Sequence, residues 1–176
     1  MLVKVVPYNP QWKEEFHAES QEIAAVLAEN LIFIHHIGST AILNIYAKPI
    51  IDFLIEVKEL NLVTTKTAKM KALGYEAMGE FGLIGRRYFR KENSFGVRTH
   101  HVHIYEQNSS EVQRHLAFRD YMIAHPQDAE KYSLLKQELA KKYPTDIESY
   151  MDGKDEFIRS MEKKAIQWQA SIDKNY

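Results

Sequence analysis

The segment from Ile34 to Val57 constrains the fold most, because it holds two β-rich apolar runs separated by a turn signal and a proline. The first run ends at Gly38, and the second, IIDFLIEV, begins after Pro49. Short runs rich in Ile, Val and Phe are typical of strands. A proline at the start of a strand is tolerated because no ladder donor is needed there. The segment therefore predicts two strands joined by a turn and a short helix over residues 40–46.

The rest of the chain predicts helices on both sides of further β-rich sequence. A strand is expected near residues 75–80, followed by a hairpin whose turn lies around Asn93 to Gly96. Apolar residues at helical spacing predict helices over residues 10–29, 61–73, 111–124, 128–142 and 154–170. The order is a helix, a mixed sheet and a helical C-terminal third. It predicts an α+β fold in a single domain over residues 1–176.

Composition excludes several classes of protein. The chain has 176 residues and a formal net charge of −1, so no global field attracts it to nucleic acid or a membrane. No nucleic-acid recognition motif is present, and the expected partner is a small phosphorylated ligand. The absence of cysteine excludes disulfides and thiolate metal sites. No run approaches the ~18 apolar residues of a membrane span, and no signal core is seen, so a cytoplasmic location is expected. The oligomeric state stays open.

The turn Gly38-Ser39-Thr40 is the first candidate site. A glycine directly after a strand lets the backbone approach a ligand closely. Amides at the start of a helix bind anions, and the two hydroxyl groups add donors. Phosphate chemistry needs such donors because the transferred group carries spread negative charge. The alternative is a tight turn with a helix cap and no ligand.

Asp52 is the second candidate, because an aspartate in the middle of an apolar strand is costly if it is buried unpaired. Alternation places Ile51, Phe53 and Ile55 on one face and Asp52 on the other. Asp52 is either a Mg²⁺ ligand, since hard cations with phosphates take one or two carboxylates, or the partner of a cation such as Lys48. Lys48 is itself a candidate phosphate ligand.

The third candidate is a basic, histidine-rich hairpin between residues 86 and 103. Alternation places His101 and His103 on one face of their strand, where two imidazoles can bind one metal or one phosphate. Arg86 and Arg98 suit bidentate phosphate contacts, and the cluster as a whole predicts an anion pocket. A solvated hairpin with half-exposed imidazoles is the alternative. His35 and His36 point to opposite sides of their strand, so at most one can join this pocket, and His36 is the additional candidate.

Several motifs together resemble the GrpB family of the nucleotidyltransferase-fold superfamily. They run in order along nearly the whole chain: HIGSTA at 36–41, AKPIID at 47–52, RRYF at 86–89, RTHHVHIY at 98–105, FRDYMIAHP at 118–126, YSLLK at 132–136, and Tyr150, Lys154 and Phe157. Within similar sequences a glycine is usual where Asn44 stands here. The resemblance implies a nucleotidyltransferase-like mixed sheet with helices packed on one face and a cleft on the other.

The resemblance also implies roles for particular residues. Gly38 and Ser39 would hold a triphosphate, Asp52 would be the first metal-binding carboxylate, and the reaction would be Mg²⁺- or Mn²⁺-dependent transfer of a nucleoside monophosphate from a nucleoside triphosphate. The wider superfamily places a second carboxylate two residues later, where this chain has Leu54. His101 or His103 stands at the third acidic position. This donor set suits one ion better than the two of a two-ion mechanism.

Three functions therefore stay open. The first is a metal-dependent nucleotidyltransferase built on Asp52. The second is a non-catalytic module that binds a nucleotide or phosphate and supports a partner enzyme, which the presence of Leu54 favours. The third is a hydrolase in which Zn²⁺ or Mn²⁺ is held by a set of one carboxylate and three imidazoles: Asp52, His36, His101 and His103.

Overall fold

The computed structural model describes residues 2–174. The chain folds into two compact units, each assembled from segments that are distant in sequence. Unit 1 comprises Met1–Asn9, Gly38–Pro49 and Arg114–Tyr176, and unit 2 comprises Pro10–Ile37 and Ile50–Gln113. The segment from Ile34 to Val57 thus contributes its two strands to unit 2 and its turn to unit 1.

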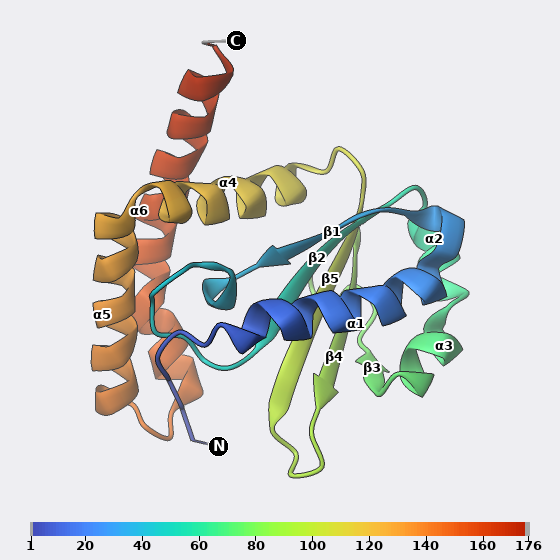
Figure 1. Ribbon diagram of the computed structural model, residues 1–176, viewed down its shortest axis with the longest axis horizontal. Coiled ribbons are helices and arrows are strands. Elements are labelled where there is room, and N and C mark those ends of the chain that lie inside the picture. Colours follow the sequence, from blue (N-terminus) through green and yellow to red (C-terminus); the bar gives the residue numbers. More distant parts are fainter. Residues whose placement is uncertain (1, 175–176) are drawn as a thin grey trace. The chain divides into compact units, whose positions relative to one another are not determined.

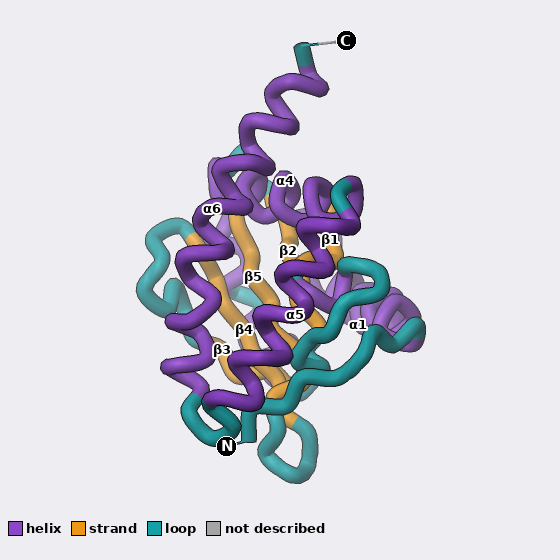
Figure 2. The backbone as a smooth tube through the Cα atoms, turned by 90° about the vertical axis from the view of Figure 1, so that its left-hand side faces the viewer, coloured by secondary structure: helices purple, strands orange, loops and turns teal. Residues whose placement is uncertain are grey.

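Unit 2 is built on a five-stranded sheet, seen side by side in Figure 2 in the order β1-β2-β5-β4-β3. β2 and β5 are parallel, and the other neighbours are antiparallel. The mixed sheet predicted from the sequence is confirmed, with its hairpin turn between β4 and β5. The strands are β1 Leu31–Ile37, β2 Ile51–Val57, β3 Tyr75–Ala77, β4 Arg86–Glu92 and β5 Arg98–Glu106.

One face of this sheet is covered by α1, Gln11–Leu27, as Figure 1 shows. Phe16 of α1 stacks on Phe53 of β2, with ring centroids 5.1 Å apart. Phe53, Val102 and Ile104 on this face are 0% exposed, so the apolar alternation in β2 and β5 builds the core of unit 2.

The helix expected over residues 61–73 is divided into α2, Leu60–Thr64, and α3, Thr67–Ala72. The break coincides with threonine hydroxyls that bond to backbone carbonyls. Thr65 Oγ1 donates to the Leu62 carbonyl at 2.6 Å, and Thr67 Oγ1 donates to the Thr64 carbonyl at 2.8 Å. Such local bonds compete with a continuous helix.

Unit 1 holds α5, Pro126–Lys142, α6, Ile147–Asp173, and most of α4, Ser110–Ala124. The helical C-terminal third is confirmed. α6 begins seven residues before the expected Lys154, because Asp146 caps its start by accepting a hydrogen bond from the Ser149 amide at 3.1 Å. The buried residues of these helices form the core of the unit, including Ala117, Met122, Tyr132, Met161 and Ala165.

The helix predicted over residues 40–46 is wrong. A single 3₁₀ turn, Ser39–Ala41, takes its place. Asn44 has φ of 65°, a left-handed conformation that a helix cannot continue through.

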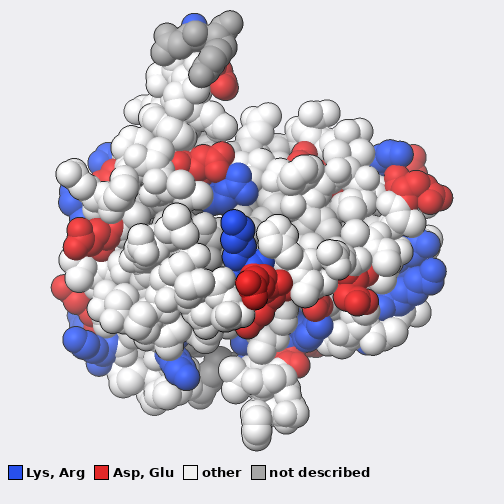
Figure 3. All heavy atoms as spheres, viewed as in Figure 1, with Lys and Arg blue, Asp and Glu red and all other residues white. Residues whose placement is uncertain are grey.

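Charge is distributed without large blocks of one sign on the face seen in Figure 3, where acidic and basic side chains are intermixed. This matches the net charge of −1. Among residues 2–174, none of the helices combines the length and apolar character needed to cross a membrane.

Candidate functional site

The register of the sheet brings three predicted site residues onto one face of unit 2. β2 pairs with β5 so that Asp52 lies opposite His101 and Leu54 lies opposite His103. Residues directly opposite in a ladder project to the same side, and this side faces away from α1. The sequence prediction that Asp52, His101 and His103 share a face agrees with this placement.

Asp52 contacts both histidines through one oxygen. Its Oδ1 lies 3.3 Å from His101 Nδ1 and 3.6 Å from His103 Nε2. The other ring nitrogen of His103, Nδ1, lies 3.3 Å from Arg86 Nη1. Since the guanidinium can only donate, His103 Nδ1 accepts and its Nε2 carries the proton directed at Asp52. Arg86, His103, Asp52 and His101 thus form a continuous chain, here called the Asp52 group.

The electrostatics of Asp52 follow from these contacts. Burial raises the pKa of the carboxyl, but hydrogen bonds from His101 and His103, and the electrostatic interaction with both rings, lower it more, so its pKa lies well below the usual range. Its side chain is 24% exposed and that of His101 is 25% exposed, so the Asp52 group is partly open to solvent. The aspartate is ionised at neutral pH and is compensated by the protein itself.

Arg86, which the sequence suggested as a phosphate ligand, is buried and bonded to other parts of the protein. It is 7% exposed, and its guanidinium lies 4.8 Å from the Tyr88 ring centroid. Arg86 Nε donates to the Glu80 carbonyl at 3.2 Å, and Nη2 donates to the Phe81 carbonyl at 3.0 Å. These bonds hold the loop before β4, so Arg86 orients His103 and has few donors left for a ligand.

Arg98 retains more donor capacity. Arg98 Nη2 bonds to Glu92 Oε1 at 3.1 Å, while Nε is buried and has no hydrogen-bond partner among the described residues.

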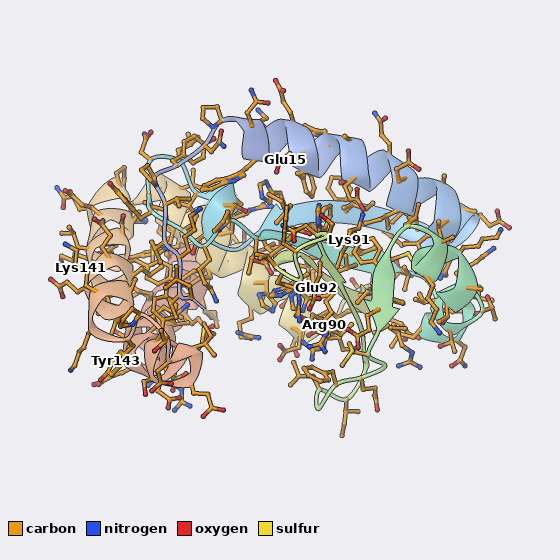
Figure 4. The ribbon with its side chains drawn as sticks, turned by 90° about the horizontal axis from the view of Figure 1, so that it is seen from below. Glu15, Arg90, Lys91, Glu92, Lys141 and Tyr143 are labelled. Atoms are coloured by element: carbon orange, nitrogen blue, oxygen red, sulfur yellow. The ribbon has the colours of Figure 1, made fainter. Side chains whose placement is uncertain are left out.

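The two basic residues at the end of β4 are paired with acidic side chains. Arg90 pairs with Glu76 at 3.0 Å. In Figure 4 the side chains of Arg90 and Lys91 leave β4 on opposite sides, with Lys91 toward α1. Lys91 Nζ bonds to Glu19 of that helix at 2.6 Å.

His36 lies on the α1 face of the sheet. Its ring stacks on Phe16 with centroids 4.6 Å apart and an angle of 10° between the planes. In the pairing of β1 with β2, His36 lies opposite Phe53, which is also on the α1 face. His36 therefore does not join the Asp52 group. His35 is on the Asp52 face but bonds to Glu56 at 2.7 Å.

The Gly38-Ser39-Thr40 turn belongs to unit 1. Gly38 has φ of 74°, in the left-handed region that favours glycine. The 3₁₀ turn that follows has three residues, which is too short to supply the aligned amides of an α-helix N-terminus. Thr40 is 2% exposed, so its hydroxyl faces the interior, whereas Ser39 is half-buried. Ser39 is thus the more accessible hydroxyl of the turn.

Lys48, also in unit 1, approaches aromatic and sulfur groups of α6. Its Nζ lies 3.9 Å from Met151 Sδ and 5.5 Å from the Tyr150 ring centroid.

The Asp52 group contains the donor types that the sequence assigned to a metal ion. A carboxylate and two imidazoles are chemically suited to one borderline divalent ion such as Mn²⁺. Here, however, Asp52 contacts both imidazoles directly. Across residues 2–174, no group of three or more His, Asp and Glu side chains is arranged to hold a metal ion. A metal could bind only by displacing the two His–Asp contacts.

Two buried lysines were not selected from the sequence as site residues. Lys136 of α5 is 1% exposed and Lys154 of α6 is 6% exposed. Each follows a tyrosine by four residues, in YSLLK and YMDGK. This spacing places both side chains on one helix face, and the repeated pattern is the signal that could have indicated them.

Comparisons with known proteins cover nearly the whole chain. The model of the family described as GrpB protein matches residues 2–164. UPF0157 protein YqkA of Bacillus subtilis is 48% identical over 94% of this chain, which spans 48% of that protein. Glutamate-rich protein GrpB of Alkalihalophilus pseudofirmus is 34% identical, with 89% of this chain and 91% of that protein covered.

A solved structure is also similar to this chain over nearly its whole length. The conserved protein GrpB from Enterococcus faecalis has a TM-score of 0.90 and 46% identity, covering 94% of this chain and 99% of that one. The poly(U) polymerase Cid1 matches with a TM-score of 0.47 and 12% identity over 74% of this chain and 45% of that chain, a similarity from which no functional conclusion follows. The chain belongs to the GrpB family.

Proposed function

We propose that the chain binds the phosphate groups of a nucleotide-like small molecule and does not carry out two-ion nucleotidyl transfer. The observation that carries this proposal is the contrast between Asp52 and Leu54, two residues apart on β2. Asp52 is compensated by His101 and His103, and Leu54 is 0% exposed. Two-ion transfer needs carboxylates that hold cations at both the attacking and the leaving oxygens. One compensated carboxylate beside a buried leucine does not provide them.

The support for a phosphate ligand comes from donors that lack protein acceptors or remain accessible. Arg98 has a buried Nε without a partner among the described residues, and a guanidinium matches phosphate geometry. In unit 1, the half-buried Ser39 hydroxyl is a separate candidate donor. The expected ligand is a nucleoside triphosphate or another phosphorylated metabolite, and the expected setting is the cytoplasm.

The test combines thermal stabilisation with a search for turnover. Nucleoside triphosphates should raise the Tm of the wild type, and the shift should shrink in Ser39→Ala and Arg98→Ala. With α-labelled triphosphates, Mn²⁺ and candidate acceptors, no label should be transferred. If no phosphorylated ligand changes the Tm, or both variants respond like the wild type, the proposal fails.

Metal-dependent nucleotidyl transfer is the second candidate, because Asp52, His101 and His103 do converge on one face. It requires Mg²⁺ or Mn²⁺ to displace the His–Asp contacts. Label transfer that is lost in Asp52→Asn would support it and overturn the first proposal. The hydrolase hypothesis needed four metal ligands, and one of them, His36, lies on the α1 face of the sheet, away from Asp52.

A further inference from the structure

Three lysine side chains gather around two tyrosine rings in unit 1. Lys48 Nζ lies 5.5 Å and Lys154 Nζ lies 4.7 Å from the centroid of the same ring, Tyr150. Lys136 Nζ lies 4.3 Å from the centroid of the Tyr132 ring. We call Lys48, Lys136 and Lys154 the lysine cluster.

The helices build this cluster with a repeated local motif. On α5, Lys136 follows Tyr132 by one helical turn, and on α6, Lys154 follows Tyr150 in the same way, so each ammonium reaches back over the ring below it. The two helices approach closely at Gly153, where an added Cβ would lie 2.5 Å from Leu139 Cδ2. A larger residue would separate the two motifs.

Lys48 is brought to the cluster by backbone anchors. The Tyr46 amide donates to Ser133 Oγ of α5 at 2.9 Å. Ala47 forms an isolated antiparallel bridge with Val6, with both hydrogen bonds made, at 2.9 and 3.0 Å. These contacts fix the chain immediately before Lys48, so its ammonium reaches Tyr150 from a defined position.

Lys136 is the member of the cluster that most needs a ligand. It is 1% exposed, and its Nζ has no hydrogen-bond partner among the described residues. Among the described residues, Lys154, Lys48 and the Tyr132 ring lie close enough to act on its amine. Burial, and then the charges of Lys154 and Lys48, lower the pKa of Lys136 to about 6. Contact with an aromatic face offsets only part of the cost of burying an ammonium.

A second buried donor belongs to Tyr150, whose ring contacts Lys48 and Lys154. The Tyr150 hydroxyl is also buried and has no hydrogen-bond partner among the described residues. Burial, followed by the neighbouring Tyr132, raises the pKa of Tyr150, so this hydroxyl stays protonated and can donate. Buried polar groups in native proteins are almost always satisfied, and a group left over points to a missing partner.

We propose that the lysine cluster, together with the Tyr150 hydroxyl, binds a phosphate-class oxyanion. Ammonium groups repel metal cations, and they are point-charge donors suited to a compact, multiply charged oxyanion. The inference deepens the proposed function, on which it rests for the nature of the ligand. It names Lys136 and Lys154 as binding residues and requires neither a metal nor Asp52.

Sulfate is the first probe, because it has the shape of phosphate and does not titrate near neutral pH. At pH 7.5 Lys136 is neutral when the site is empty and charged when an anion is bound, so binding takes up close to one proton per sulfate. Calorimetric titration of the wild type in two buffers of different ionisation enthalpy measures this uptake. It requires no variant.

Variants then locate the site. Lys136→Met should weaken sulfate binding by at least tenfold and abolish proton uptake. Lys141→Met is the matched control on the same helix, because Lys141 is exposed at the C-terminal end of α5 (Figure 4), and it should bind within twofold of the wild type. Unchanged binding in Lys136→Met, or binding without proton uptake in the wild type, overturns the inference.

Two further ligands identify the source of the oxyanion. Tripolyphosphate and a nucleoside triphosphate should both compete with sulfate in a Lys136-dependent way. If only tripolyphosphate and inorganic phosphate compete, the lysine cluster binds phosphate and the proposed nucleotide function fails. If nucleotides bind with no effect of Lys136→Met, the proposed function stands and this inference fails.

Discussion

The Asp52 group in unit 2 and the lysine cluster in unit 1 handle buried charge in opposite ways. Asp52 has two imidazoles against one carboxylate oxygen, and an arginine supports one of them. Lys136 has two other lysines as its charged neighbours, and its ammonium lacks a hydrogen-bond partner among residues 2–174. The first arrangement is complete without a ligand. In our proposal, a bound anion completes the second.

Variants of the Asp52 group should be tested mainly by their stability, and variants of the lysine cluster by both stability and anion binding. Removing one member of a compensated group leaves the others uncompensated and lowers stability. Removing a buried amine whose protonation is opposed by burial and by neighbouring lysines should instead raise stability and, if the inference holds, weaken anion binding.

The largest effect is expected from Leu54→Asp, which places a second carboxylate two residues after Asp52. Leu54 is 0% exposed, so the new charge would be buried beside the ionised Asp52. We expect a loss of about 3–5 kcal/mol in the free energy of unfolding, measured by urea titration at pH 7. Leu54→Met is the control and should cost less than about 1.5 kcal/mol. A stable Leu54→Asp protein would mean that the Asp52 face accommodates a second carboxylate.

Lys136→Met should raise stability. In the wild type the pKa of Lys136 is about 6 when folded and 10.5 when unfolded, so the unfolded state binds more protons between these values. Wild-type stability therefore increases as pH rises from 6 toward 10.5. The variant should be about 2 kcal/mol more stable at pH 7, an increase in Tm of about 4–8 °C, and should lose this advantage near pH 10.

Lys141→Met provides the reference for this series and should change stability by less than about 0.5 kcal/mol. The measurement is thermal unfolding at several pH values without added anions. A Lys136→Met protein that is less stable than the wild type at pH 7 would show that the ammonium is compensated in the fold, and the contrast with Asp52 would disappear.

Asp52→Asn should lower stability by about 1–2 kcal/mol at pH 7, a value reduced because the side chain is partly exposed. The folded pKa of Asp52 is depressed, so its contribution is present above the unfolded pKa of about 4 and is lost as pH falls below it. Urea titrations at pH 7, 5 and 3 should therefore show the two proteins converging in acid. A difference that grows in acid would contradict the compensation of Asp52 by the histidines.

Tyr150→Phe should have the smallest effect on stability, within about 0.5 kcal/mol, because the hydroxyl makes no hydrogen bond to another described residue that could be lost. Its effect should appear in binding. One hydrogen bond to the anion corresponds to a sulfate affinity about 3–10-fold weaker. Wild-type affinity in this variant would remove the hydroxyl from the proposed site while leaving the lysines in it.

Much of unit 2 could be predicted from the sequence. The alternation IIDFLIEV, read with period two, placed Asp52 opposite the apolar face, and the same reading of β5 placed His101 and His103 with it. Parallel pairing of β2 with β5 then aligned them, and this long-range register is not encoded in any local pattern. The divided helix over residues 60–72 was missed because threonine hydroxyls override weak helix propensity.

Unit 1 was harder to predict at the level of its site. Helical periodicity located α4, α5 and α6, but a lysine in an amphipathic helix is ordinarily solvated, so Lys136 and Lys154 gave no reason to expect burial. Their burial depends on the close approach of α5 and α6 at Gly153 and on the segment that carries Lys48. The turn at Gly38 was recognised, whereas the helix after it was not formed, because Asn44 adopts a left-handed conformation.

The most direct measurement is the location of a bound oxyanion. A crystal of the wild type soaked in selenate, with data collected at the selenium edge, would show each bound anion as an anomalous peak. The account predicts the strongest peak among the Nζ atoms of Lys48, Lys136 and Lys154, and its loss in crystals of Lys136→Met. A strongest peak beside the Asp52 group, or occupancy of the lysine cluster that survives Lys136→Met, would contradict it.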